Sequence, residues 1–525
     1  MAGAGAGSLA AQRDSAVPAL PPVIEAIRLR RHNVYAAEEA RSFIPRLVNR
    51  FHFQTRAGVI QREILFGAGE RYDPLLVAET ERNLRRLGVF RRVQVDSVRA
   101  DSGGVIVMVE TQDAWSTKPE FTFRTTGGQL AYRISLIEEN LFGTASRLSA
   151  SYYNDPDRDA FLFAFYQPRL VAGRVGLSLF YDDRSDGYVF DGVISQPYLS
   201  LAGRNAWSLG VDTRDERILR YFEGAEAPGD TVRRLLDGVD AGYGWALRGD
   251  SRGYVRLAFS GRLWRDDFLG PDDEDLDGTR LAYGVLWGTV DWRRSRYVKV
   301  RGFRSNRVED VDLSSTARFG LGLTPKAFGY DDDGVVPSLT ARTGAVFKDK
   351  GFAYVDLTAR GRFTGAGLDS GTVQTAATVA YLPNDRHLAL LHGWVGWLHN
   401  PRPGGEFDFG FGVGPRAYRL HAFTGDRGVF TTAEYRYMLA EDFLTIADVG
   451  VAAFVDWGGA WYSGERRRTA WDFGLGLRVG TSRSTDLLLN RIDLGYRAGN
   501  DREVSGWVLV IGKGFVFSSS GVVNR

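Results

Sequence analysis

From residue 118 to residue 525, apolar side chains alternate with small or polar ones in one short segment after another. The clearest segment is WDFGLGLRV at 471–479, which puts Trp, Phe, Leu, Leu and Val on one face and Asp, Gly, Gly and Arg on the other. Successive side chains of a β-strand point to opposite faces, so this period of two indicates strands. The chain is therefore predicted to be mainly β, with a long antiparallel array of strands joined by turns.

The same alternation favours a barrel in a membrane over a soluble sandwich. RLSASYY at 147–153 again puts Leu148, Ala150 and Tyr152 on one face, with serines opposite. An apolar face toward lipid and a small or polar face toward a lumen is typical of a membrane barrel, whereas a sandwich buries its apolar face. Lipid cannot satisfy open strand edges, so the strands should close into a ring. The expected fold is an antiparallel transmembrane β-barrel over 118–525.

The composition removes several functional classes. The 525 residues include no cysteine, which excludes a disulfide framework, a thiolate nucleophile and a cysteine-containing zinc site. The 66 basic and 64 acidic residues leave a net charge of +2, so the chain has no basic footprint for nucleic acid. No run of about 18 apolar residues occurs, which excludes a spanning helix but not a barrel.

The motifs of common enzymes are also missing. The sequence has no Gly-Lys-Ser/Thr phosphate loop and no HExxH. None of the six histidines shows ligand spacing on one face with a third partner. We therefore expect no enzyme activity, no metal and no cofactor.

Residues 23–112 read as a separate α/β domain. Its best helix lies at 74–87, where Asp73 can cap the first turn and Gly88 ends the helix. Residues 36–49 also look helical, although a proline interrupts the pattern. The run GERYDPLLVAETERNLRRLGVFRRVQVDSV, followed by VIVMVE, resembles a POTRA module, the periplasmic domain that precedes certain outer-membrane barrels; an unrelated βααββ fold is the alternative.

The first 22 residues, MAGAGAGSLAAQRDSAVPALPP, lack the cationic start and the apolar centre of a signal peptide. We expect residues 1–22 to be a flexible lead-in or the remnant of a signal peptide. Export is therefore predicted from the body of the chain.

A group of charged residues lies near the C-terminus, within 415–436 and 454–461. Glu434 and Asp456 each fall on a candidate strand, and Arg416 lies in the Gly-rich segment before them. If the two strands are neighbours, both carboxylates project into the lumen beside that segment. A guanidinium suits the pair because its planar fork binds a carboxylate through two bonds. The alternative is an ordinary lumen lining, since arginine and acidic residues line most barrels.

This order of loop, Glu strand and Asp strand resembles the signature of the BamA/TamA superfamily of outer-membrane assembly and export barrels. In that family a loop folds back into the lumen, and its (V/L)RG(F/Y) motif docks on an acidic pair carried by the next two strands. The matching segment here is PRAY at 415–418, with Ala417 in place of the usual glycine and Pro415 in place of the aliphatic residue. The resemblance implies a barrel lock formed by Arg416, Tyr418, Glu434 and Asp456.

VRGF also occurs literally, at 300–303. In the family the docking loop is followed by five strands, whereas roughly twice that number follow Phe303. Position therefore favours Arg416 over Arg301 as the docking arginine. Five candidate strands follow Tyr418, at about 430–438, 449–457, 471–480, 488–497 and 507–517.

The resemblance also implies a seam between the first and last barrel strands, here 119–126 and 507–517, that opens sideways into the membrane. Gly512 and Gly514 lie in the last strand, and glycine weakens strand pairing. Arg416 would brace the wall opposite this seam. The family form has about sixteen strands, whereas about twenty candidate segments are present here.

The function that the resemblance implies is the insertion or translocation of client polypeptides in the outer membrane of a Gram-negative bacterium, with the POTRA domain in the periplasm. The expected partners are outer-membrane lipid or lipopolysaccharide, unfolded outer-membrane or secreted clients, and periplasmic partners of the POTRA domain, but no nucleic acid. A two-partner-type secretion pore and a passive porin are the alternatives. Fold alone does not establish which activity the chain has.

Overall fold

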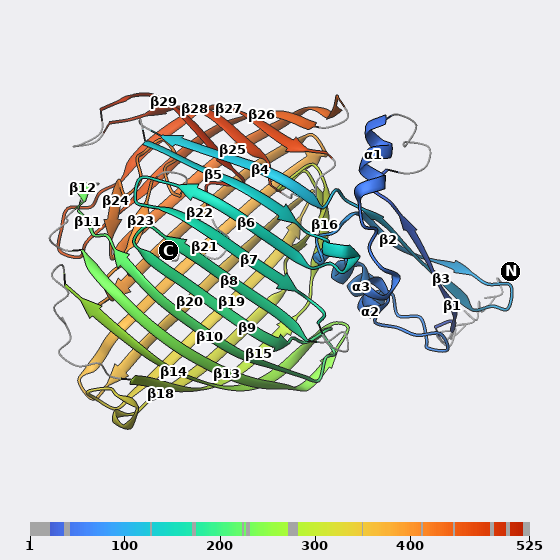
Figure 1. Ribbon diagram of the computed structural model, residues 1–525, viewed down its shortest axis with the longest axis horizontal. Coiled ribbons are helices and arrows are strands. Elements are labelled where there is room, and N and C mark those ends of the chain that lie inside the picture. Colours follow the sequence, from blue (N-terminus) through green and yellow to red (C-terminus); the bar gives the residue numbers. More distant parts are fainter. Residues whose placement is uncertain are drawn as a thin grey trace, which may run out of the picture.

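The computed structural model describes most of the chain as a barrel with a small domain at one end (Figure 1). The N-terminal domain lies against one mouth of the barrel, which we call the near end; the opposite mouth is the far end. The described residues are 21–35, 43–126, 129–170, 175–222, 225–226, 231–270, 282–348, 350–410, 413–444, 447–482, 488–499 and 504–517.

The N-terminal domain has a three-stranded sheet in the order β1-β3-β2, with β1 parallel and β2 antiparallel to β3. One face of the sheet packs on α2 and α3 through buried aliphatic side chains such as Ile60, Leu84 and Val107. The elements are β1 (Ile24–His32), α1 (Phe43–Phe51), α2 (Ala57–Glu63), α3 (Pro74–Arg86), β2 (Phe90–Arg99) and β3 (Val105–Asp113).

The helix expected at 74–87 is α3, and the Asp73 side chain accepts a hydrogen bond from the Leu75 amide at 2.8 Å, as an N-cap does. The helix expected at 36–49 is present over its described part and extends two residues further. That part, α1, is Phe43–Phe51, and residues 36–42 lie outside the described residues. The pattern did not predict α2, because seven residues are too few to show a helical period.

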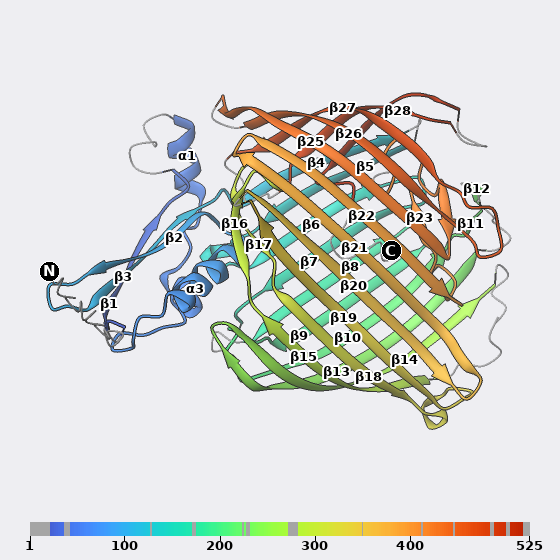
Figure 2. The same cartoon turned by 180° about the vertical axis from the view of Figure 1, so that it is seen from behind.

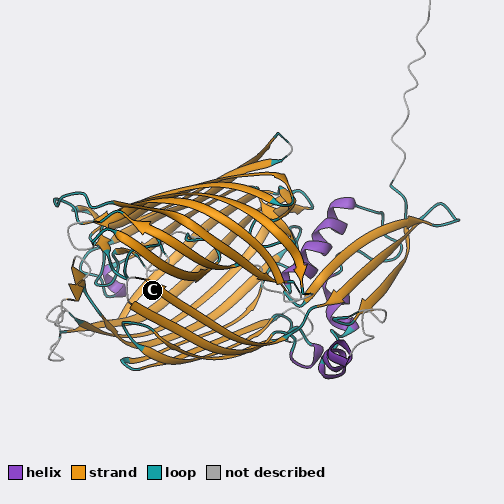
Figure 3. Cartoon of the chain, turned by 90° about the horizontal axis from the view of Figure 1, so that it is seen from above, coloured by secondary structure: helices purple, strands orange, loops and turns teal. Residues whose placement is uncertain are grey.

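Within the described residues, twenty strands form one closed ring, as the segment count predicted and four more than the family form. Figures 1 and 2 show opposite walls of this ring, and Figure 3 shows it from above. In ring order the strands are β4 (Thr117–Thr126), β5 (Gln129–Glu138), β6 (Arg147–Asn154), β7 (Asp159–Gln167), β8 (Gly176–Arg184), β9 (Gly187–Gln196), β10 (Asn205–Ile218), β13 (Val232–Asp250), β14 (Gly253–Leu269), β15 (Ala282–Arg294), β18 (Ser315–Thr324), β19 (Gly334–Phe347), β20 (Gly351–Thr364), β21 (Gly367–Asn384), β22 (His387–His399), β25 (Arg427–Phe443), β26 (Ala447–Trp461), β27 (Ala470–Thr481), β28 (Asn490–Arg497) and β29 (Gly506–Lys513).

Short pairs of strands lie in the connections between the barrel strands. The pairs β11 (Tyr221–Phe222) with β12 (Ala225–Glu226) and β23 (Phe407–Phe409) with β24 (Phe423–Gly425) belong to far-end connections. The hairpin β16 (Tyr297–Arg301) with β17 (Val308–Asp312) joins β15 to β18 at the near end. These connections bring side chains to both mouths of the barrel.

The inward and outward faces follow the alternation of the sequence. On β26, Val451 and Val455 are exposed on the outer face, while Phe454 and Asp456 are buried in the lumen. On β27, Trp471, Phe473, Leu475 and Leu477 are exposed outside the barrel. Among the described residues, no helix has the length and apolar character needed to cross a bilayer.

The last strand is shorter than expected. We predicted strand through 507–517, but β29 ends at Lys513 because Gly514 adopts a φ of +73°, a conformation that L side chains rarely take. The chain then turns into the lumen, where Val516 is buried and Phe515 contacts Phe303. The barrel closes where β29 meets β4, and the ammonium of Lys513 pairs with Glu120 across this seam.

Candidate functional site

The connection between β22 and β25 leaves the far end and folds back into the lumen. Its two arms pair as β23 with β24, and the segment between them reaches down to the middle of the neighbouring strands. Gly410, with a φ of +128°, permits a close crossing, because a Cβ there would overlap the carbonyl of Arg419. The described aromatic residues around this infolded loop fill the lumen beside β22, β25 and β26: Trp394, Phe407, Phe409, Tyr418, Phe423 and Phe430.

Arg416 is fully buried at the end of this infolded loop and binds the two predicted carboxylates. Its Nε donates to Asp456 Oδ2 at 2.7 Å, and its Nη2 donates to Asp456 Oδ1 at 3.1 Å, which is the two-bond geometry expected of a guanidinium. Its Nη1 donates to Glu434 Oε2 at 3.1 Å. The guanidinium also lies 3.7 Å from the centre of the Phe454 ring.

Tyr418 and Ala417 hold the rest of the motif. The Tyr418 hydroxyl donates to the carbonyls of Trp471 and Ala498 at 3.0 and 2.6 Å. The Ala417 amide donates to Asp472 Oδ2 at 2.9 Å, and Ala417 does not adopt a positive φ. Alanine therefore fits where the family motif has glycine. All four residues predicted for the lock, Arg416, Tyr418, Glu434 and Asp456, lie together.

The charge cluster extends over more residues than sequence reasoning selected. Asp493 on β28 accepts from Arg416 Nη1 at 3.0 Å and from Arg478 Nη1 at 2.5 Å. Arg478 also donates to Glu434 at 3.0 Å, so the two arginines share both acids. The signal for these residues was a lone charge among apolar neighbours on a strand. The whole cluster consists of Arg416, Arg436, Arg478, Arg491, Glu434, Asp456, Asp472 and Asp493.

The position of this cluster corrects one expectation. We predicted that Arg416 braces the wall opposite the seam, but its acidic partners lie on β25, β26 and β28. In the ring, β28 is the neighbour of β29, and the wall opposite the seam is formed by β15 and β18. The loop is the connection between β22 and β25, so it reaches only the wall beside these strands. It therefore ties together β25, β26 and β28, which lie close to the seam.

The two predicted seam glycines have different roles. Gly512 pairs with Arg491 in the ladder between β28 and β29, and a Cβ at Gly512 would lie 2.8 Å from the Arg491 guanidinium. Gly512 thus makes room for a member of the charge cluster. Gly514 lies just outside β29 and turns the chain inward.

At the far end, His421 joins the infolded loop to two other connections. Its Nδ1 contacts Asp408, its Nε2 lies 3.1 Å from Asp157, and its ring stacks on Tyr221 with 3.5 Å between ring centres. Burial alone would lower the pKa of His421, but hydrogen bonds and charge from Asp157 and Asp408 outweigh burial and raise the pKa to about 9. The imidazolium therefore links the three connections at neutral pH.

At the near end, the β16–β17 hairpin lies between the N-terminal domain and the lumen. Arg85 on α3 binds Asp310 through two bonds of 2.7 and 2.9 Å. The tip of the hairpin carries the literal VRGF, and the carbonyl of its buried Phe303 accepts from Arg436 at 3.3 Å. VRGF is thus not the motif of the infolded loop, in agreement with the positional argument, yet it touches the same charge cluster from the other side.

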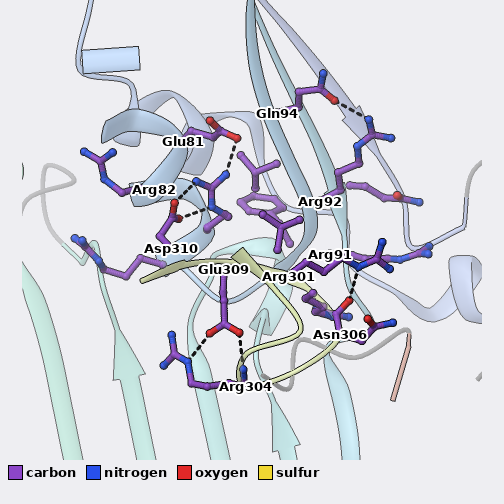
Figure 4. Close-up of a pocket in the computed structure, with 18 of the residues that line it drawn as sticks. Glu81, Arg82, Arg91, Arg92, Gln94, Arg301, Arg304, Asn306, Glu309 and Asp310 are labelled. Atoms are coloured by element: carbon purple, nitrogen blue, oxygen red, sulfur yellow. Dashed lines mark hydrogen bonds and ion pairs between the residues drawn. The ribbon is translucent and has the colours of Figure 1, made fainter. Parts of the chain in front are cut away.

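Figure 4 shows the cavity of about 900 Å³ that this hairpin leaves against α3 and β2. Its walls carry arginines and carboxylates that pair with each other, including Arg304 with Glu309 and Arg85 with Glu81. Across the described residues, no group of three or more His, Asp or Glu side chains is arranged to hold a metal.

We compared the chain with known proteins. No family model matches it. It is 27% identical over 300 residues to the outer membrane protein assembly factor BamA of Neorickettsia risticii (strain Illinois), covering 54% of this chain and 37% of that protein. The chain therefore spans well under half the length of this curated relative.

Solved structures show the likeness of the fold. CdiB from Escherichia coli aligns with a TM-score of 0.50 at 13% identity, covering 94% of this chain and 76% of that chain. CdiB from Acinetobacter baumannii gives a TM-score of 0.47 at 10% identity, with 94% and 74% covered. BamA from Haemophilus ducreyi lacking POTRA domains 1–3 gives 0.38 at 12% identity, with 94% and 84% covered. The sequence similarity to a BamA, together with the barrel fold shared with CdiB, supports a place in the BamA/TamA-type superfamily of outer-membrane β-barrel proteins.

Proposed function

We propose that the protein inserts or translocates client polypeptides in the outer membrane, without enzymatic chemistry, through a barrel that opens sideways between β29 and β4. The N-terminal domain would act as a POTRA domain, lie in the periplasm and receive the unfolded client. Outer-membrane lipid or lipopolysaccharide would surround the barrel, and periplasmic proteins could dock on the domain.

The observation that carries this proposal is the set of buried ion pairs in the wall beside the seam. Arg416 binds carboxylates on β25, β26 and β28, so buried ion pairs hold these strands together. The next strand, β29, has only eight residues and ends where the chain turns inward. A terminal strand that borders this ion-paired wall is the element that can separate from β4 and offer its backbone groups to an incoming strand.

The filled lumen argues against a passive porin. The infolded loop occupies the lumen beside β22 and β25, and Phe303 enters it from the near end. A steady wide conductance would therefore require both elements to leave. The fold shared with E. coli CdiB favours a two-partner-type secretion pore as the second candidate.

A reversible lock on the seam tests the proposal. Because the chain has no cysteine, Glu120→Cys and Lys513→Cys can be joined by a short thiol cross-linker across β4 and β29. The control pair is Arg342→Cys with Asp356→Cys, which joins β19 to β20 within the wall.

In vesicles given an unfolded barrel client, the seam cross-link should stop client insertion, reduction of the linker should restore it, and the control pair should have no effect. Insertion that continues with the seam closed contradicts sideways opening. Export of a client through the lumen with the seam closed supports the secretion pore, and a steady conductance unaffected by either pair supports the porin.

A further inference from the structure

Helix α1 has its polar side toward the protein and its apolar side away from it. The Asn49 side chain exchanges hydrogen bonds with the backbone of Tyr35, at 3.1 and 2.9 Å, and so faces the domain. Phe43, Leu47 and Phe51, spaced four residues apart, share the opposite face. Their exposed fractions are 69%, 42% and 71%, which is the reverse of a helix that packs on a soluble core.

This apolar face continues onto the barrel. The segment after α1 is fixed to the β5–β6 connection, because the Arg56 amide donates to the Gly143 carbonyl at 2.9 Å and the Asn140 side chain donates to the Phe53 carbonyl at 3.2 Å. The exposed rings of Phe53 and Phe142 meet edge to face, with 5.6 Å between their centres.

The barrel surface next to Phe142 is the lipid-facing band. Leu136 near the end of β5 and Leu148 near the start of β6 are both exposed on the outer face. Exposed apolar side chains therefore follow one another from the outside of the barrel, through Phe142 and Phe53, to α1. The outer band of the barrel faces the hydrocarbon of the membrane. The apolar side chains beyond the end of this band, on Phe142, Phe53 and α1, therefore lie at the surface of the same membrane.

The orientation and charge of α1 suit that boundary. Figure 1 shows α1 running across the long axis of the barrel, so the helix lies along the membrane plane at the near end. Arg46 and Arg50 are exposed beside the apolar face, where their side chains can extend toward anionic headgroups.

We propose that α1, with Phe53 and Phe142, is a membrane-surface anchor that buries its apolar face in the near-end leaflet beside the first barrel strands. The anchor fixes the N-terminal domain beneath β4–β6, next to the seam. This inference requires only that the barrel spans a membrane, and it does not depend on client insertion.

Single cysteines test the anchor in the full chain folded into vesicles that contain anionic phospholipid. Leu47→Cys is labelled with an environment-sensitive fluorophore, and nitroxide lipids and aqueous iodide serve as quenchers. Leu136→Cys on the barrel band is the lipid-exposed control. Asp101→Cys, in the exposed turn between β2 and β3, is the aqueous control.

We expect nitroxide lipid to quench the label at Leu47, and iodide quenching there to be about threefold weaker than at Asp101. Labels at Phe43→Cys and Phe51→Cys should report equal depth, because the helix lies flat. A label at Leu47 that behaves like the one at Asp101 overturns the proposal. Protection from iodide without quenching by nitroxide lipid also overturns it, because another protein or a second copy would then cover the face. Heat-modifiable migration of each variant verifies that the barrel is folded.

Discussion

Replacing Arg416 with alanine is the strongest test of the charge cluster. The cluster contains four arginines and four carboxylates. Arg416→Ala removes the guanidinium that these carboxylates share in a place with no access to water, since the exposed fractions of Arg416 and Asp456 are both 0%. Asp456 loses both of its bonds to the guanidinium, and Glu434 and Asp493 lose one each.

The size of the effect follows from burial. Removing one partner of a buried ion pair costs about 3–5 kcal/mol, because the other charge stays buried without compensation. At about 1.4 kcal/mol per tenfold change, the ratio of folded to unfolded barrel should fall by roughly two to three and a half orders of magnitude. Arg416→Lys should recover only part of this loss, because an ammonium cannot present the same planar fork to Asp456.

The matched control is Arg318→Ala in the same lumen. Arg318 donates to Asp291 at 2.6 Å, but its side chain is 63% exposed, so loss of this pair should cost only about 0–1 kcal/mol. Urea unfolding in lipid vesicles measures the free energy of unfolding, and heat-modifiability in SDS gels gives the temperature at which each barrel unfolds.

Equal losses for Arg416→Ala and Arg318→Ala would refute the reasoning, because burial would then not set the cost. The double variant Arg416→Ala with Asp456→Asn provides a second check. It removes both partners of one buried ion pair, so its destabilisation should be smaller than the sum of the two single variants. Additive losses would show that the two side chains act independently.

Three further predictions concern the parts around the cluster. Gly476→Ala should lower the unfolding temperature of the barrel much more than Gly242→Ala. A Cβ at Gly476 would overlap the Asp493 carboxylate, whereas a Cβ at Gly242 would meet nothing closer than 3.3 Å. Equal shifts of the unfolding temperature would contradict this packing. The pKa of His421 is raised to about 9, so its contribution to stability is complete below about pH 6.5 and is lost as the pH rises through about 9. The melting temperatures of the parent and of His421→Gln should therefore converge at high pH. A difference that stays constant with pH would contradict the assignment. Asp310→Ala, which frees the β16–β17 hairpin from Arg85 on α3, should raise single-channel conductance, while Asp332→Ala in an exposed far-end turn should not; an unchanged conductance would mean that the hairpin does not obstruct the lumen.

Much of the barrel could be predicted from the sequence because the period of two is local. Each strand shows which of its residues face lipid, and the turns show where it ends, so a count of about twenty segments was possible without coordinates. The order of Arg416, Glu434 and Asp456 along the chain also placed them on one loop and on two strands that prove to be adjacent.

Other parts of the site depend on contacts between distant segments. Asp493 joins the cluster because the infolded loop brings Arg416 to β28, and Phe303 meets Arg436 because the near-end hairpin turns into the lumen. The pattern of one strand can show that a charged residue faces the lumen, but not which partner it meets there. The end of β29 was missed for a similar reason, since the inward turn at Gly514 is supported by packing of Phe515 on Phe303.

The sequence by itself determined the closed barrel and the identity of its docking arginine, because alternation and strand order are properties of the chain. Tertiary structure alone decided which wall the loop holds, which acids complete the cluster, and that the apolar face of α1 points away from the protein toward the near-end membrane boundary. Those features arise from the curvature and closure of the ring, which bring side chains far apart in sequence into contact.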